Sequence, residues 1–235
     1  MVVFHVPESG VFGFLYRVTD VIYKLAWSNV LWFFTAGLPI VLLISGDWII
    51  PTILFMLIGP PGTAALFHVM RVWVEETDVS VWREYWRGWK ASWKRAYKVI
   101  DTYIIIGIIL VVDLIVTVNA EETFVRWIGF LLLPMLTLYV LTSVTLLPLC
   151  VRFDWKLLTL LKNAFIMAIG HLFSTLAVLI SVCVIIVGAL QIMPPLAFFF
   201  FASLAAWAFT WQTNRIVQRI QALADEHMAE DTDDQ

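Results

Sequence analysis

The sequence predicts an all-α protein, a polytopic transmembrane helical bundle of about six spans with interfacial amphipathic helices on the cytoplasmic side. Of the 235 residues, 61% are apolar and only 14% are charged, and the mean hydropathy is +0.88. A soluble domain carries about 25% charged residues, so this chain is too poor in charge to cover a water-facing surface. Its apolar residues also gather in stretches long enough to cross the hydrocarbon core, which is about 30 Å thick.

The predicted spans are, in chain order, 25–45, 48–72, 100–118, 125–149, 172–190 and 195–213. Each approaches or exceeds the roughly 20 apolar residues that a spanning helix needs. The chain is then divided into three parts. A cytoplasmic interfacial segment is expected at 1–24, the six-span domain at 25–215, and an acidic, disordered cytoplasmic tail at 216–235.

The distribution of Lys and Arg predicts the orientation, because positively charged loops stay in the cytoplasm. With the N-terminus inside, fourteen of the fifteen basic residues fall in cytoplasmic segments, and only Arg126 falls outside. This assignment requires an even number of spans, so both termini are expected in the cytoplasm. The outside loops are very short, which excludes an extracellular domain able to bind a large ligand.

The segment between the second and third spans is predicted to be an amphipathic helix. Its tryptophans recur at spacings of four, three and four residues and share one helical face: Trp82, Trp86, Trp89 and Trp93. Basic residues occupy the adjoining flank: Arg83, Arg87, Lys90 and Lys94. Such a helix is expected to lie at the membrane interface, with indoles at headgroup level and cations against anionic lipid. A nucleic-acid surface is disfavoured, because the segment is tethered between two spans.

A later segment, 153–164, repeats the apolar pattern of this helix. The sequence Lys94-Arg95-Ala96-Tyr97 aligns with Lys162-Asn163-Ala164-Phe165, and both segments follow a span that enters the cytoplasm. Our hypothesis is that spans two–three and four–five form a diverged parallel repeat, since internal repeats are common in transporter folds. Chance agreement of a few residues is the alternative.

Two prolines interrupt the second span near the bilayer centre, within Gly59, Pro60, Pro61 and Gly62. Proline removes a backbone donor and clashes with the preceding turn, so a kink or break is expected. Breaks at membrane depth survive where protein or a water-filled cavity satisfies the freed groups, and in transporters they form substrate sites. This segment and His68, two turns beyond it, are therefore candidate cavity residues. A kink packed against neighbouring helices is the competing interpretation.

Asp113 is the carboxylate that lies well inside a predicted span. An ionisable residue in the membrane is costly and is a functional hypothesis by default, with His68 or Asn29 as possible partners. The alternative is a protonated acid near the outer interface.

The sequence carries no catalytic fingerprint: GxSxG, HExxH, CxxC, the Walker loop and the dinucleotide-binding pattern are all absent. Cys150, Cys183 and the four histidines show no ligand spacing, so neither a metal nor a cofactor is expected. We therefore do not expect an enzyme.

Several motifs resemble those of YesL-type bacterial membrane proteins in order and spacing. They are Asn29-Val30-Leu31-Trp32 with Leu38-Pro39, Gly59-Pro60-Pro61-Gly62-Thr63-Ala64-Ala65-Leu66, the Trp82–Trp93 segment, Leu147-Pro148, and Leu160-Leu161-Lys162-Asn163-Ala164-Phe165. The similarity extends from about residue 10 to residue 215, and the doubled proline departs from the single proline expected in that family. The resemblance implies a bacterial inner-membrane protein of undetermined activity, often associated with carbohydrate uptake, and it supplies no catalytic or binding residues.

Two functional interpretations follow. In the first, the protein is a non-enzymatic accessory to carbohydrate uptake, whose partners are membrane lipid and either a transporter subunit or a second copy of the chain. In the second, it is a small-solute transporter or channel, with the broken second helix and Asp113 lining the path. A continuous polar cavity joining Asp113, His68 and the Gly59–Gly62 break favours transport, and a packed bundle favours the accessory.

Overall fold

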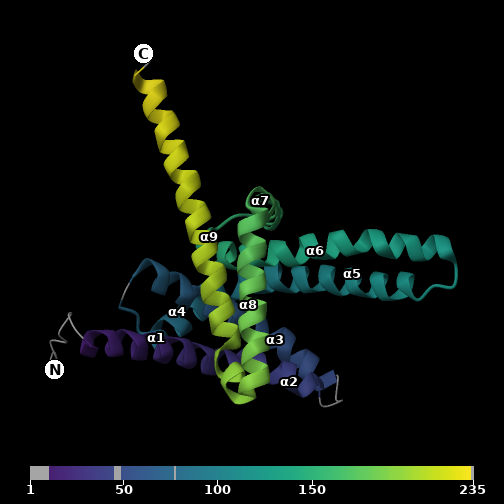
Figure 1. Cartoon of the computed structure of the whole chain (residues 1–235), viewed down its shortest axis with the longest axis horizontal. Coiled ribbons are helices and arrows are strands. Elements are labelled where there is room, and N and C mark those ends of the chain that lie inside the picture. The colour runs from purple at the N-terminus through teal and green to yellow at the C-terminus, as the bar shows by residue number, and fades with distance from the viewer. Residues whose placement is uncertain (1–10, 45–48, 77, 234–235) are drawn as a thin grey trace.

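The computed structural model describes residues 11–44, 49–76 and 78–233, and every regular element in these ranges is a helix, which confirms the predicted all-α fold. Short connections join the helices (Figure 1). In chain order they are α1 (Val11–Trp32), the π-helix η1 (Phe33–Gly37), α2 (Leu38–Ile44), α3 (Ile49–Glu75), α4 (Val81–Ala96), the π-helix η2 (Tyr97–Asp101), α5 (Thr102–Val118), α6 (Thr123–Arg152), α7 (Leu157–Gly170), α8 (Leu172–Ile192) and α9 (Pro194–Asp233).

Five helical stretches of the described residues are long and apolar enough to cross a membrane, judged by length and composition. They are Gly13–Leu42, Ile49–Glu75, Val81–Val118, Thr123–Arg152 and Leu172–Ile192, and each contains one of the first five predicted spans in whole or in large part. The sixth predicted span, 195–213, lies within α9, but residues 195–198 lie outside the residues over which spans were assessed, so the five stretches do not test it.

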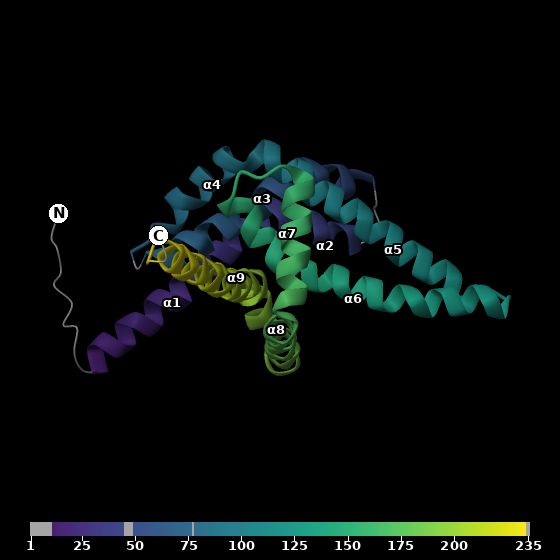
Figure 2. The ribbon, with the colours of Figure 1, turned by 90° about the horizontal axis from the view of Figure 1, so that it is seen from above.

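The helices do not form a bundle of parallel rods. In Figure 1 the α5–α6 hairpin reaches away from the other helices, and α8 runs across its direction. Figure 2 shows the same hairpin projecting to one side of the molecule. Within the hairpin the rings of Tyr103 and Tyr139 stack with centroids 4.2 Å apart. The Tyr139 hydroxyl donates to the Tyr103 carbonyl at 2.8 Å, and the Tyr103 hydroxyl donates to the Tyr139 carbonyl.

Two apolar clusters hold the helices together near the base of this hairpin. The first lies between α1, α3, α4 and α9 and includes Trp32, Ala65, Leu66 and Tyr85. The second lies between η2, α5, α6, α7 and α9 and includes Val99, Leu146, Leu160 and Ile216. Most apolar side chains farther along the hairpin are exposed, as expected for helices that face lipid.

Both ends of the chain differ from the sequence prediction. The expected interfacial segment 1–24 falls partly on residues 1–10, which lie outside the described residues, and residues 11–24 are continuous with the first span in α1. Lys24 Nζ lies 2.6 Å from Asp20 Oδ2, one helical turn earlier. This ion pair stabilises the helix next to the predicted boundary between residues 24 and 25. The expected disordered tail 216–235 is helical as far as Asp233, because Ile216 and Val217 are buried in the second cluster and anchor it.

The order of the elements agrees with the repeat hypothesis. Both α3–α4–α5 and α6–α7–α8 begin with a long helix, of 27 and 30 residues, that is followed by two shorter ones. Both members of two aligned pairs of positions are also buried: Ala96 and Ala164, and Val99 and Met167. The two units differ at the second junction, where η2 makes α4 and α5 continuous but His171 separates α7 from α8.

Candidate functional site

An extensive helix contact at the centre of the molecule is formed by α3 and α4. The buried face of α4 follows a helical spacing and consists of Val81, Glu84, Tyr85, Gly88, Ser92 and Ala96. Several of these are small residues, which let two helices approach closely. The approach is tightest at Gly88, where an added Cβ would lie 2.6 Å from His68 Cβ.

The predicted tryptophan face of α4 is therefore only partly a lipid-facing surface. Trp86 and Trp89 are half-buried against the first apolar cluster, whereas Trp82 and Trp93 are 54% and 48% exposed. Because α4 packs along α3 and continues through η2 into α5, it belongs to the bundle and is not a separate helix lying beneath it. The basic flank predicted for it is exposed: Arg83, Arg87, Lys90 and Lys94.

The Pro60-Pro61 segment remains helical and is buried in protein. Pro61 has no N–H to donate to the Leu57 carbonyl one turn earlier, and the hydroxyl of Tyr97 donates to that carbonyl instead. The fully buried Tyr85 donates its hydroxyl to the Gly62 carbonyl at 3.1 Å. Gly62 also packs so tightly that an added Cβ would lie 2.5 Å from Thr35 Oγ1. Of the two interpretations of the proline segment, a break that lines a cavity or a segment packed against neighbouring helices, these contacts favour the second.

His68 lies beside this contact, and its Nε2, which makes no hydrogen bond within the described residues, faces a residue that the sequence did not single out. Glu84 is 4% exposed, and its carboxylate lies 3.6 Å from His68 Nε2 and 2.9 Å from Arg87 Nη1. The signal available in the sequence was an acidic residue on the otherwise basic helix that faces the second span. Arg87 thus neutralises a carboxylate held inside the protein.

Asp113 is not part of this cluster. It lies exposed on α5, in the projecting hairpin, where its backbone carbonyl accepts a hydrogen bond from Thr117 at 2.6 Å. Asn29, its other suggested partner, holds α1 to α9 by accepting bonds from the backbone N–H groups of Ala202 and Ser203 at 3.1 and 3.2 Å. His68 and Gly62 therefore both pack against α4, and Asp113 lies apart from them.

A second cluster of charges joins helices that are distant in the sequence. Arg152, at the end of α6, lies 3.3 Å from Glu75 of α3 and donates to Asn214 of α9 at 2.5 Å. Arg71 donates to the Val151 carbonyl at 2.9 Å. This network ties the ends of α3 and α6 to the middle of α9.

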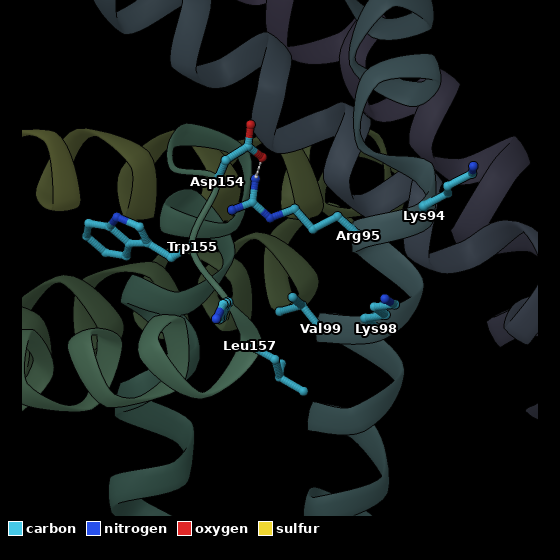
Figure 3. A pocket seen from close by; sticks show the side chains of 8 residues that line it. Lys94, Arg95, Lys98, Val99, Asp154, Trp155 and Leu157 are labelled. Carbon is cyan, nitrogen blue, oxygen red and sulfur yellow. Dashed lines mark hydrogen bonds and ion pairs between the residues drawn. The ribbon is translucent and has the colours of Figure 1, made fainter.

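A basic pocket of about 530 Å³ opens where η2 meets the connection between α6 and α7. Figure 3 shows its lining: Lys94, Arg95, Lys98, Val99, Asp154, Trp155, Lys156 and Leu157. Arg95 Nη1 donates to Asp154 at 2.5 Å, while Arg95 Nη2 is buried and makes no hydrogen bond within the described part of the chain. Sequence reasoning missed this pocket, because Lys156 joins the other cations only through the fold.

Metal chemistry finds no support in the part of the chain that the structure describes. There, no three His, Cys, Asp or Glu side chains gather in an arrangement able to hold a metal ion.

Comparisons with known proteins find one match to the part of the chain that contains the α3–α4 contact and one over nearly its whole length. Residues 25–114 match a family described as protein of unknown function, DUF624. The whole chain is similar to the uncharacterized protein YteU of Bacillus subtilis (strain 168), with 28% identity over 234 residues that cover 95% of this chain and 92% of YteU. No solved structure matches. Both findings confirm the sequence-based resemblance, at the level of a YesL-like family of unknown function.

Proposed function

We propose that this chain, whose residues 25–114 match the unknown-function family DUF624, is a non-enzymatic accessory of a membrane transport system. The observation that carries the proposal is the packing of the Pro60-Pro61 segment. Tyr97 and Tyr85 supply hydroxyl donors to its carbonyls, and Gly62 is in tight contact with Thr35. A protein hydroxyl therefore satisfies the carbonyl freed by Pro61, a kind of group that a broken transporter helix leaves for its substrate, and this supports the proposal.

The position of Asp113 supports the same choice over a small-solute transporter or channel. A transport path needs polar groups that face one another across the protein, whereas Asp113 is exposed on a hairpin that projects from the bundle. His68 instead packs against Gly88 of α4, with the Glu84 carboxylate 3.6 Å from its Nε2, and not toward Asp113.

The system that this accessory assists is carbohydrate uptake, and the support for this step is the family resemblance. Its partners would be membrane lipid and a transporter subunit or a second copy of the chain, with no nucleic acid. Affinity purification of the tagged full chain in mild detergent tests the proposal. A stoichiometric transporter subunit in the eluate is expected, and transport by the chain alone in proteoliposomes would contradict the proposal.

Replacing Asp113 with alanine separates the two functions in cells. If the chain is an accessory, deleting it should lower sugar uptake, and Asp113→Ala should restore uptake to within about twofold of the wild type, since the side chain faces lipid. The measurement is uptake of labelled sugar at matched protein levels, with Asp113→Asn as the conservative control. A loss of uptake in Asp113→Ala alone, with Asp113→Asn active, would favour the transporter.

Reporter fusions test the proposed location, a bacterial inner membrane with both termini in the cytoplasm. Alkaline phosphatase, which is active only outside the cytoplasm, should be active when inserted after Glu121 and inactive when fused after Gln235. A fluorescent protein that folds only in the cytoplasm should give the opposite pattern. The basis is the positive-inside distribution of Lys and Arg, and an active phosphatase at the C-terminus would overturn the orientation.

A further inference from the structure

We infer that the basic pocket binds the phosphate of an anionic phospholipid, with one acyl chain lying in the apolar groove beside it. Four cationic side chains against one carboxylate give the pocket a formal charge of +3: Lys94, Arg95, Lys98 and Lys156 against Asp154. Basic pockets between membrane helices on the cytoplasmic side are recognition sites for anionic headgroups. This inference stands independently of the accessory role.

Arg95 has a guanidinium nitrogen that makes no hydrogen bond within the described residues. Its side chain is 21% exposed, and its Nη1 is bound to Asp154, whose own side chain is fully in solvent. Its Nη2 is buried and has no hydrogen-bond acceptor within the described residues. A phosphate oxygen offers a charge-assisted acceptor for such a guanidinium nitrogen.

An apolar groove of about 360 Å³ lies one helical turn from the pocket. Val99 and Leu157 line the pocket, and the residues four positions further along each helix, Tyr103 and Leu161, line the groove. Residues four apart share a helix face, so the pocket and groove adjoin on two helices at once. The rest of the groove is formed almost entirely by apolar side chains: Ile106, Leu110, Met135, Leu138, Tyr139, Thr142 and Phe165.

This pairing of a cationic pocket with an apolar groove selects the chemistry of the ligand. A free phosphate would use the pocket and leave the groove empty, whereas a phospholipid uses both. The exposed Trp155, stacked on Phe153 with centroids 4.3 Å apart, is the kind of amphipathic side chain that sits at headgroup level. The pocket lies on the side that the positive-inside rule assigns to the cytoplasm, where anionic lipids attract basic residues.

The first test is titration of the purified full chain in detergent with phosphatidylglycerol or phosphatidylcholine, followed by native mass spectrometry. The wild type should bind phosphatidylglycerol at least tenfold more tightly. The triple variant Lys94→Gln/Lys98→Gln/Lys156→Gln should lose about 100-fold, since each cation near anionic lipid contributes several-fold in affinity. A charge-matched control uses three exposed residues outside the pocket, Lys90→Gln/Lys162→Gln/Arg219→Gln, and should change affinity by less than about threefold. Equal losses in both triples would overturn the inference.

Replacing Asp154 should instead strengthen phosphatidylglycerol binding. Because this carboxylate occupies one nitrogen of Arg95, Asp154→Asn should tighten phosphatidylglycerol binding several-fold. Unchanged or weaker binding by a variant that melts at the wild-type temperature would overturn the role of Arg95. If the triple variant does not fold, the single Lys156→Gln, in the connection before α7, replaces it and should lose several-fold.

Substitutions in the groove test whether the ligand is a lipid or a free anion. Leu110→Trp should fill the groove and weaken phosphatidylglycerol binding at least tenfold, while Ile109→Trp, at a neighbouring position that is 53% exposed, should leave it unchanged. Inorganic phosphate at millimolar concentration should fail to displace the lipid. Displacement by phosphate together with full binding by Leu110→Trp would overturn the lipid assignment in favour of a free phosphate.

Discussion

Replacing Gly88 with valine is expected to destabilise the protein by about 3 kcal/mol, through overpacking of the α3–α4 contact. An added Cβ would meet His68 Cβ at 2.6 Å and His68 Cγ at 2.7 Å. These atoms sit close to the α3 backbone and do not belong to the far end of a flexible side chain, so α4 must move away from α3. The Glu84–His68 pair, which bridges the same two helices, would separate with it. Thermal unfolding in detergent, followed by size-exclusion chromatography, measures the loss.

The matched control is the same substitution at Gly188, in α8. No heavy atom lies within 4 Å of a Cβ built at that glycine, so the added side chain faces open space. Valine also has a better helix propensity than glycine, so Gly188→Val should be neutral or slightly stabilising. Gly88→Ala should fall between the two, at about 1–2 kcal/mol. If Gly88→Val and Gly188→Val had the same melting temperature, the close approach of α3 and α4 would not be a feature of the folded protein.

The same contact shows what the sequence could predict about α4. Hydrophobic spacing predicted the helix and a lipid-facing tryptophan face, of which Trp82 and Trp93 are exposed, but it did not predict the face that packs against α3. The residues that face α3 lie one position before the tryptophans and include Gly88, Ser92 and Ala96, which a hydrophobicity pattern does not count. Their spacing of four is the small-residue pattern of packed membrane helices, so this signal was present in the sequence.

Other features depend on long-range contacts that a pattern cannot supply. The sequence predicts that the prolines free backbone carbonyls, but the donor to Leu57 is Tyr97, 40 residues away. Lys94 was recognised as part of a basic flank, whereas Lys156 reaches the same pocket only because α6 returns beside η2. Asp113 was given partners on the assumption of a compact bundle, and the projecting α5–α6 hairpin removes it from them.

The replacement of Pro61's missing N–H by the Tyr97 hydroxyl is open to a double-mutant cycle. Tyr97→Phe should destabilise the protein by about 1–3 kcal/mol, because it removes the hydroxyl donor from the Leu57 carbonyl and a carbonyl facing lipid has no water to bind. Tyr23→Phe, at a tyrosine that is 57% exposed on α1, is the control and should be close to neutral.

The cycle is completed by Pro61→Ala, which restores a backbone N–H one turn after Leu57. In that background the helix itself satisfies the Leu57 carbonyl, so Tyr97→Phe should cost less than about 0.5 kcal/mol. The coupling between residues 61 and 97, measured from four melting curves in the same detergent, should therefore approach the full cost of Tyr97→Phe in the wild type. Additive effects would mean that Tyr97 contributes only packing at this position. The choice of an accessory over a transporter, which rests on the packing of the Pro60-Pro61 segment, would then lose its principal support.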